Sequence, residues 1–253
     1  MEWRDTGIVL GLRRHGEHDA LLEILCEGRG RVLGIVKGGY SRRQRGNLQP
    51  GNLLSVTWRA RLETQMGVLT TEIARVHGLA LCHDVLRLEA LTALIAMASA
   101  TLPEREPHPA AFSGLLAVID LLDASGDEPA AWPRWAGAVA QWEAALLADL
   151  GYGLDLTACA ATGGVDDLIY VSPKSGRAVS AAAGRAYHDK LLPLPAFLRE
   201  GGSAVSMGEA AAGLTLTSFF LERHVLGPHG ATLPPARLRF AERVASAARP
   251  GVE

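Results

Sequence analysis

A run of basic side chains between Lys37 and Arg61 is the part of this sequence best suited to bind a polyanion. The run contains six Lys and Arg residues and no acidic residue. Arginine offers a planar fork of donors that matches phosphate oxygens and stays charged at any working pH. Residues 1–61 carry a net charge of +5, whereas residues 62–253 carry −7. This segregation favours nucleic-acid binding by the N-terminal part; the alternative is a solvated surface loop.

The arginines of this run are expected on two kinds of element. Arg42, Arg43 and Arg45 follow a Gly-Gly pair, and we expect them in a loop that closes over a bound strand. Arg59 and Arg61 are two residues apart on a predicted strand, so they are expected to share one face. Phosphate contacts of this kind hold a strand without reading its bases.

Two aromatic residues are candidate platforms for stacking with bases. Tyr40 lies inside the basic run, whereas Trp58 alternates in phase with Leu54 and Val56, which favours a place in the core. Trp3 is expected to cap the same core. The complete predicted nucleic-acid-binding set is Arg13, Arg14, Lys37, Tyr40, Arg42, Arg43, Arg45, Arg59 and Arg61.

Other residue types that could carry chemistry do not form a site. Asp166 and Asp167 are adjacent on a predicted strand and therefore point to opposite faces, so they cannot share acid–base work. The histidine pairs His15/His18 and His77/His83, the second near Cys82, lack the compact spacing of a metal site. We therefore expect no catalytic residue, no metal and no cofactor, and a protein that is not an enzyme.

Composition and length point to an ordinary globular protein. The chain has 253 residues, of which 48% are apolar and 21% charged. Its three cysteines are odd in number and far apart, which favours a reducing compartment. The longest charge-free apolar stretch of the helical part, Ala90–Leu102, is shorter than the roughly 20 residues of a membrane span. The sequence thus predicts a cytoplasmic protein with no membrane segment.

The first 76 residues have the pattern of a small β-barrel. Short apolar runs are separated by glycines and polar pairs, and some alternate with a period of two. The predicted strands are Thr6–Arg14, Ala20–Cys26, Arg31–Lys37, Asn52–Leu62 and Met66–Val76. Five such strands favour an OB-fold. We predict an OB-fold domain over residues 1–78 that binds nucleic acid.

Beyond residue 78 the apolar period becomes that of helices. Stripes such as Leu91, Leu94 and Ile95, and a Ser206–Glu209 capping box, predict an all-helical domain over residues 79–253. A small hairpin module interrupts it at about 156–183, with strands near Asp167–Val171 and Arg177–Ser180. The expected fold class is α+β with two domains.

The order of several short motifs resembles that of the RecO family of bacterial recombination mediators. They are Thr6-Gly7-Ile8-Val9-Leu10, Gly16-Glu17-His18-Asp19, the ten residues from Gly30 to Gly39, Arg42-Arg43, Leu48-Gln49-Pro50 and Asp149-Leu150-Gly151-Tyr152. The resemblance implies an OB-fold followed by a helical domain with a zinc-type module. It further implies binding of single- and double-stranded DNA, strand annealing, and action with RecR to load RecA onto DNA coated by single-stranded-DNA-binding protein (SSB). A nucleoid-associated cytoplasmic location would follow.

The sequence departs from this family at the module. Zinc-binding members carry two Cys-x-x-Cys pairs, but here the first reads Cys159-Ala160-Ala161-Thr162 and the second, near Val179–Ala183, has no Cys or His. Structural zinc needs about four such ligands. We therefore expect a degenerate module without metal.

Two other functions fit parts of the sequence. An RNA-binding OB-fold protein would use the same basic face, and a metal-dependent nuclease would need an acidic cluster that we do not find. A pocket for the SSB C-terminal tail would need an apolar groove beside a basic residue, and Arg87, Arg134, Arg223 and Arg237 remain open as candidates.

Overall fold

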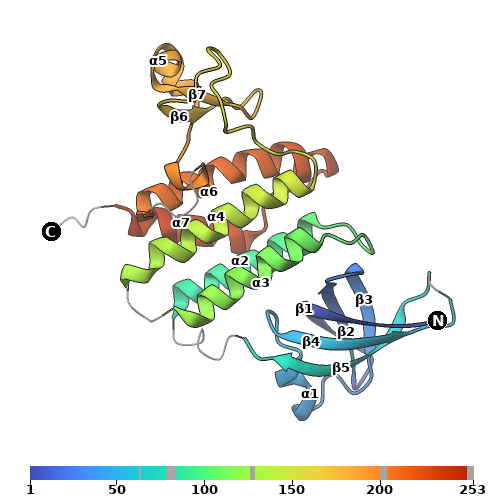
Figure 1. The fold of residues 1–253 in the computed structure, drawn as a ribbon. Coiled ribbons are helices and arrows are strands. Elements are labelled where there is room, and N and C mark those ends of the chain that lie inside the picture. The colour runs from blue at the N-terminus through green and yellow to red at the C-terminus, as the bar shows by residue number, and fades with distance from the viewer. Residues whose placement is uncertain (63, 78–83, 126–128, 200–203, 250–253) are drawn as a thin grey trace. The chain divides into compact units, whose positions relative to one another are not determined.

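The N-terminal part of the chain forms a closed five-stranded barrel (Figure 1). The computed structural model describes residues 1–62, 64–77, 84–125, 129–199 and 204–249. The barrel strands are β1 (Glu2–His15), β2 (Asp19–Cys26), β3 (Gly30–Val36), β4 (Leu53–Arg59) and β5 (Gly67–Arg75). Their order is β1-β2-β3-β5-β4, closed by antiparallel pairing of β1 with β4. The predicted OB-fold is confirmed.

The alternating pattern of the strands fills the barrel with one apolar core. Along β4, Leu54, Val56 and Trp58 are buried, whereas Ser55 and Arg59 are exposed. Only 2% of Trp58 is exposed, so this ring belongs to the core. The core cluster comprises Val9, Leu22, Ile24, Cys26, Val32, Val36, Leu48, Leu54, Val56, Trp58 and Leu69. β1 begins earlier than predicted because its first residues pair with the far end of β4, where Trp3 lies opposite Trp58.

The contact between β3 and β5 depends on glycine. These strands pair in parallel, with Gly34 opposite Gly67. A Cβ atom on Gly67 would lie 2.1 Å from Nε1 of Trp58, and one on Gly34 would lie 2.6 Å from the Leu69 side chain. The two strands can approach the core rings this closely because neither residue has a side chain.

Two helices pack in the same compact unit as the barrel, residues 1–124. They are α2 (Val85–Thr101) and α3 (Pro109–Ala124). Asp84 begins α2 by accepting hydrogen bonds from the backbone N–H groups of Leu86 and Arg87. The helical periodicity seen around Leu91 is confirmed. The predicted domain boundary near residue 78 falls within residues 78–83, outside the described residues, and stays a prediction.

The link between α2 and α3 lies against the turn between β2 and β3. The backbone N–H of Arg105 donates to the carbonyl of Arg31 at 2.9 Å, and Arg31 Nε donates to the Leu102 carbonyl at 2.8 Å. A Cβ on Gly30, which has φ +67°, would lie 1.9 Å from the carbonyl oxygen of Glu106. Glycine is thus required both by conformation and by the close approach of the link.

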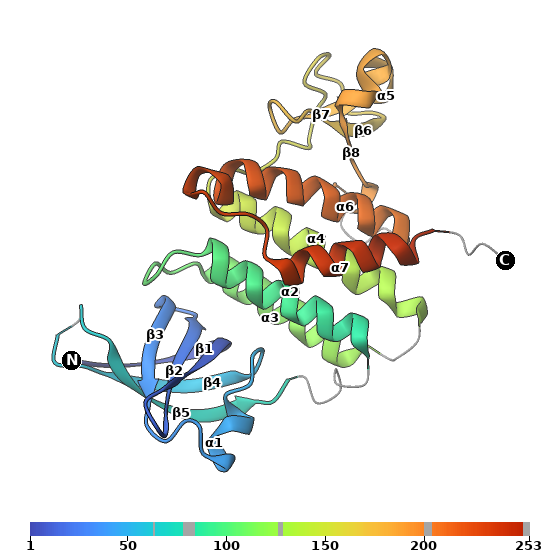
Figure 2. The same cartoon turned by 180° about the vertical axis from the view of Figure 1, so that it is seen from behind.

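Residues 125–253 form a second compact unit built on three main helices (Figure 2). These are α4 (Trp132–Asp149), α6 (Met207–Phe220) and α7 (Pro235–Ala247), preceded by a 3-10 turn at Pro129–Ala131. The predicted capping box is confirmed, since Ser206 and Glu209 bond each other's backbone N–H groups. α6 continues as a π-helical turn over Leu221–Leu226 and a 3-10 turn over Gly227–His229.

A buried ion pair joins the three helices of this second unit. Arg237 on α7 and Glu143 on α4 have side chains that are 0% exposed. Arg237 Nε and Nη2 donate to the two Glu143 carboxylate oxygens at 2.5 and 2.8 Å, and the Thr217 hydroxyl on α6 donates to Glu143 at 2.5 Å. Such a pair is stable only because each charge is both neutralised and hydrogen-bonded.

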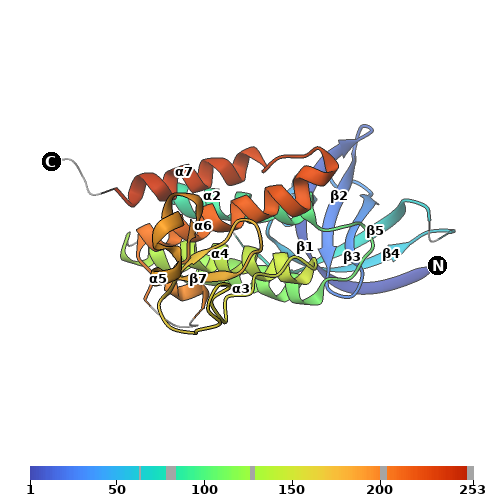
Figure 3. The same ribbon diagram turned by 90° about the horizontal axis from the view of Figure 1, so that it is seen from above.

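The predicted hairpin is confirmed as part of a small module between α4 and α6 (Figure 3). Its strands are β6 (Leu168–Val171) and β7 (Ala178–Ser180), and a third, β8 (Leu192–Pro193), pairs with β6. Short helix α5 (Ala181–Gly184) and 3-10 turns at Arg185–Lys190 and Ala196–Leu198 complete it. Sequence periodicity missed β8 and α5 because each spans too few residues to show a period.

Candidate nucleic-acid interface

The arginines expected in a loop lie instead on a short helix, α1 (Arg42–Asn47). The prediction was wrong because Ser41 caps this turn: its hydroxyl accepts from the Gln44 N–H, and its carbonyl accepts from the Arg45 N–H. Arg45 lies in the last turn of α1, where a positive charge is favourable. Its guanidinium also lies over the Tyr40 ring, 6.0 Å from the centroid.

The tip of the β1–β2 hairpin lies beside the segment that leads into α1. The Tyr40 N–H donates to the His18 carbonyl at 3.2 Å. Asp19 accepts from Lys37 Nζ at 2.7 Å and from the Gly38 N–H at 2.9 Å. Those two hydrogen bonds, the Lys37 one first, hold the pKa of the Asp19 carboxyl below its usual range. Asp19 therefore fixes Lys37 and the start of the basic segment in one position.

The structure brings together one part of the predicted set at this end of the barrel, which we call the arginine end. It comprises Arg14, Lys37, Tyr40, Arg42, Arg43 and Arg45. Arg14 on β1 is exposed, and its Nη2 donates to the Glu17 carbonyl in the adjacent hairpin turn at 3.1 Å. Figures 1 and 2 show α1 and the N-terminal end of β1 on opposite sides of the barrel.

Arg59 and Arg61 do not join the arginine end. Arg59 lies at the end of β4 opposite Glu2, to which its Nε and Nη2 donate at 2.9 and 3.1 Å. β4 ends at Arg59, so the expectation that Arg61 shares a strand face with it was wrong. The pairing of Arg59 with Glu2 spans most of the barrel sequence, and local spacing cannot reveal it.

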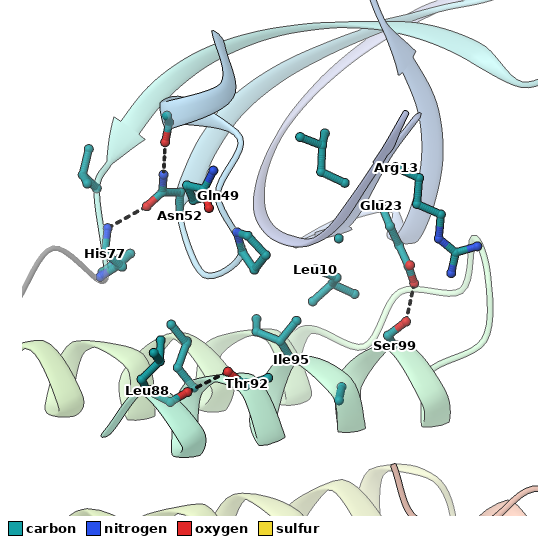
Figure 4. Close-up of a pocket in the computed structure, with 17 residues that line it drawn as sticks. Leu10, Arg13, Glu23, Gln49, Asn52, His77, Leu88, Thr92, Ile95 and Ser99 are labelled. Atoms are coloured by element: carbon teal, nitrogen blue, oxygen red, sulfur yellow. Dashed lines mark hydrogen bonds between the residues drawn. The ribbon is translucent and has the colours of Figure 1, made fainter. Parts of the chain in front are cut away.

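Arg13 is also separated from the arginine end. It lines a cavity of about 560 Å³ between the barrel and α2 (Figure 4). Arg14, the next residue along β1, points to the other face of the strand. The cavity is largely apolar, with Leu10 and Ile95 among its lining residues. Figure 4 shows Arg13 at the same end as Glu23, whose carboxylate accepts from the Ser99 hydroxyl at 2.6 Å.

Asn52, at the other end of this cavity, is a key residue that the sequence did not reveal. Only 1% of Asn52 is exposed. Its side-chain amide donates to the carbonyls of Gly46 and Asn47 at the end of α1, at 3.2 and 3.0 Å. Its Oδ1 accepts from the His77 N–H at 2.9 Å. The one signal in the sequence was the glycine at position 51. In the structure its φ of +90° marks the tight turn before Asn52.

The hairpin module does not provide the ligand set of a zinc site. Cys159 Sγ accepts from the Ser180 N–H at 3.3 Å and lies 3.5 Å from the Ser180 hydroxyl. Hydrogen bonds from Thr162 and then Ser180 lower the pKa of the thiol from its ordinary 9.0 to about 6. Thr162 and Ser180 thus surround the sulfur with hydroxyl and N–H donors where a metal site would need further thiolates. Among the described residues, no three His, Cys, Asp or Glu side chains are placed to hold a metal.

The four arginines that are candidates for a pocket for the SSB C-terminal tail fall into two classes. Arg87 and Arg237 are 2% and 0% exposed and are held by Asp84 and Glu143, so neither can receive a ligand from solvent. Arg134 and Arg223 are exposed. In the described parts of the chain, no helix is long and apolar enough to cross a membrane.

Comparison with known proteins assigns the chain to one family. Residues 1–77 match the family described as "Recombination protein O N terminal", and residues 82–232 match "Recombination protein O C terminal". The protein called DNA repair protein RecO of Caulobacter vibrioides (strain NA1000 / CB15N) is 48% identical over 247 residues, covering 98% of this chain and 99% of that relative. Proteins of the same name from Beijerinckia indica and Rhodospirillum rubrum are 48% and 46% identical, with at least 96% of each chain covered. The chain therefore belongs to the RecO family of DNA repair proteins.

Proposed function

We propose that this protein acts in DNA repair by binding DNA through the phosphate backbone at the arginine end. The single observation that carries the proposal is that the exposed residues Arg14, Lys37, Arg42 and Arg45 gather with Tyr40 at one end of the OB-fold barrel, on and beside α1. A backbone-directed surface holds any sequence, which is what a protein that anneals complementary strands requires.

Not every residue of the arginine end is equally available. Lys37 is held by Asp19, so part of its charge is already neutralised. Within the described residues, no carboxylate forms an ion pair with Arg14, Arg42 or Arg45. Arg43 lies on α1 with Arg42 and Arg45. These four charges are the proposed phosphate contacts, and Tyr40 is the proposed stacking ring.

Family membership and this surface together support a mediator role. We infer that the protein binds single- and double-stranded DNA, anneals strands, and with RecR helps to load RecA onto SSB-coated DNA. The SSB C-terminal tail would bind beside one of the two exposed arginines, Arg134 or Arg223. Binding of a tail peptide that is lost in Arg134→Ala or in Arg223→Ala would choose between them, and equal binding by both variants would eliminate both.

Single-stranded DNA binding as a function of salt tests the DNA-binding proposal. Four phosphate contacts give a slope of about −3 in a log–log plot of affinity against salt, or about 50-fold weaker binding between 50 and 200 mM. The variant Arg42→Ala, Arg43→Ala, Arg45→Ala should reduce the slope to about −0.7 for every sequence alike. Arg185→Ala, Arg223→Ala, Arg239→Ala removes the same charge from exposed positions of the second unit and should retain the original slope.

Three outcomes would count against the proposal. A slope near zero for the unmodified protein would refute phosphate binding. A tighter complex with RNA than with DNA of equal length would favour the RNA-binding alternative. Cleavage of labelled DNA in Mg²⁺ or Mn²⁺ would show the nuclease alternative.

A further inference from the structure

The cavity between the barrel and α2 has the size and position of a small-molecule pocket (Figure 4). Its volume of about 560 Å³ falls within the roughly 300–1,000 Å³ of pockets that hold drug-sized ligands. The described residues that line it all belong to the first compact unit. None of them belongs to the arginine end, so the cavity is distinct from the proposed DNA-binding surface.

Most of the lining is apolar, and part of it is open to solvent. Leu10 on β1 and Ile95 on α2 lie on opposite walls (Figure 4). Two further lining residues, Val76 and Leu88, are 47% and 44% exposed although their side chains are aliphatic. A ligand that covers these side chains removes apolar area from water, which favours binding.

Glu23 places a buried carboxylate on the wall of this cavity, since only 8% of the residue is exposed. Arg31 Nη1 and the Ser99 hydroxyl both donate to the same oxygen, Oε1, at 3.0 and 2.6 Å. The other oxygen, Oε2, has no hydrogen-bond partner within the described residues. It lies beside Gly11, which also lines the cavity and where an added Cβ would come within 3.6 Å of Oε2. A carboxylate oxygen in this position favours a ligand that donates a hydrogen bond to it.

Arg13 supplies a hydrogen-bond donor at the same end of the cavity as Glu23 (Figure 4). It is exposed and forms no ion pair with a carboxylate of the described residues, Glu23 included. The Glu23 carboxylate would repel a ligand anion at this end, and the guanidinium groups of Arg13 and Arg31 would repel a cation. A neutral group that both donates and accepts, such as an amide, complements both Glu23 and Arg13.

We propose that this cavity binds a small neutral molecule with an apolar body and an amide head. The body lies between Leu10 and Ile95, the amide N–H donates to Oε2 of Glu23, and the amide oxygen accepts from Arg13. An apolar lining with a few convergent polar groups is the usual composition of a ligand pocket. The inference goes beyond the proposed function, because no step of it requires DNA.

The test compares three ligands that share one apolar body and differ in the head: phenylbutanamide, phenylbutanoate and phenylbutylamine. Calorimetric titration of the full chain should show that the amide binds at least about tenfold more tightly than the acid or the amine. Equal affinity of the three ligands, or no binding of the amide, would overturn the site. Acetylated leucine methylamide carries the same amide group within a peptide. Its binding at least about tenfold more tightly than phenylbutanamide would assign the cavity to a partner's chain segment and overturn the small-molecule site.

Two variants locate the binding in this cavity. Ala96 lines the cavity from α2, so Ala96→Phe should fill part of it and weaken amide binding at least about tenfold, whereas Ala100→Phe adds the same ring at an exposed position outside the lining and should not. Arg13→Met should weaken amide binding about 10- to 100-fold, and Arg4→Met, at an exposed position of β1 outside the lining, should leave it unchanged. Unchanged amide binding in Arg13→Met, whose exposed side chain the fold does not need, would overturn the assignment even if Ala96→Phe failed to fold.

Glu23→Gln provides a change of specificity rather than a loss. Arg31 and Ser99 both donate to the Oε1 position, so the glutamine oxygen should take that place and its N–H group should replace Oε2. The folded variant should therefore prefer phenylbutanoate to phenylbutanamide, and a retained preference for the amide would overturn the role of Glu23. These titrations contain no DNA. Failure of the cavity therefore leaves the proposed function standing, and a salt slope near zero would refute the proposed function without affecting the cavity.

Discussion

Removing one partner of the buried Arg237–Glu143 pair should destabilise the second unit far more than removing both. Glu143→Ala would leave a fully buried guanidinium without its two carboxylate hydrogen bonds, which costs about 3–5 kcal/mol. The double variant Glu143→Leu, Arg237→Met replaces the pair by apolar side chains of similar size. Its stability should lie within about 1 kcal/mol of the unmodified protein or exceed it.

Thermal unfolding followed by calorimetry measures the difference. A change of 1 kcal/mol shifts Tm by roughly 2–4 °C in a unit of this general size, so Glu143→Ala should lower Tm by about 6–20 °C. Arg239→Met, on the exposed face of the same helix α7, is the control and should change Tm by less than about 2 °C. If Glu143→Ala matched that control, or if the double variant were the least stable of the three, the account of the pair as mutually dependent charges would be refuted.

Three further outcomes follow from the barrel and the module. Gly67→Ala should lower the free energy of unfolding in urea by about 1–3 kcal/mol, because its methyl group would meet Trp58. Gly46→Ala is the control and should not lower it, because a Cβ there has nothing within 4 Å. Equal free energies of unfolding for the two variants would contradict the close approach of Gly67 to Trp58. Because the pKa of Cys159 is lowered in the folded protein, the unfolded chain binds more protons than the folded protein between about pH 6 and 9. The stabilisation that the Cys159 thiolate contributes is therefore fully present above pH 9 and should be lost as the pH falls through 6. Cys159→Ala should abolish that part of the Tm–pH curve, and an unchanged curve would show that the thiol is not the group responsible. A chelator should leave the Tm of the purified protein unchanged, and elemental analysis that finds one zinc per chain would show that we have misplaced the ligands.

The barrel could be predicted from sequence because its strands carry local signals. Alternation along Leu54, Val56 and Trp58 indicated the core face of β4, and the glycine-bounded runs indicated where the five strands lie along the chain. α1 was missed because a six-residue helix shows no apolar period, and its cap, Ser41, lies in a segment that is also typical of a loop. The separation of Arg59 from the arginine end was missed because it depends on pairing with Glu2, far away in sequence.

Buried charges were the least predictable part of the molecule. Arg237 lies in a helix rich in charged residues, and a charge on such a helix is usually exposed to solvent. Its burial depends on Glu143 and Thr217, which come from two other helices. Similarly, the donors around Cys159 come from Thr162 in its own turn and from Ser180 on a strand 21 residues away. Local patterns carry no information about such partners.

Asn52 determines how much conformational freedom α1 has before any ligand binds. One buried amide holds the last carbonyls of α1 and, through its oxygen, the backbone of His77 where the barrel chain ends. A six-residue helix would fray readily if only its own hydrogen bonds held it. Because the barrel core anchors it, α1 presents its arginines in a conformation that is already ordered, and little backbone entropy is lost when a phosphate chain binds. The rigidity of the surface is thus supplied from inside the barrel, by a residue that touches no ligand.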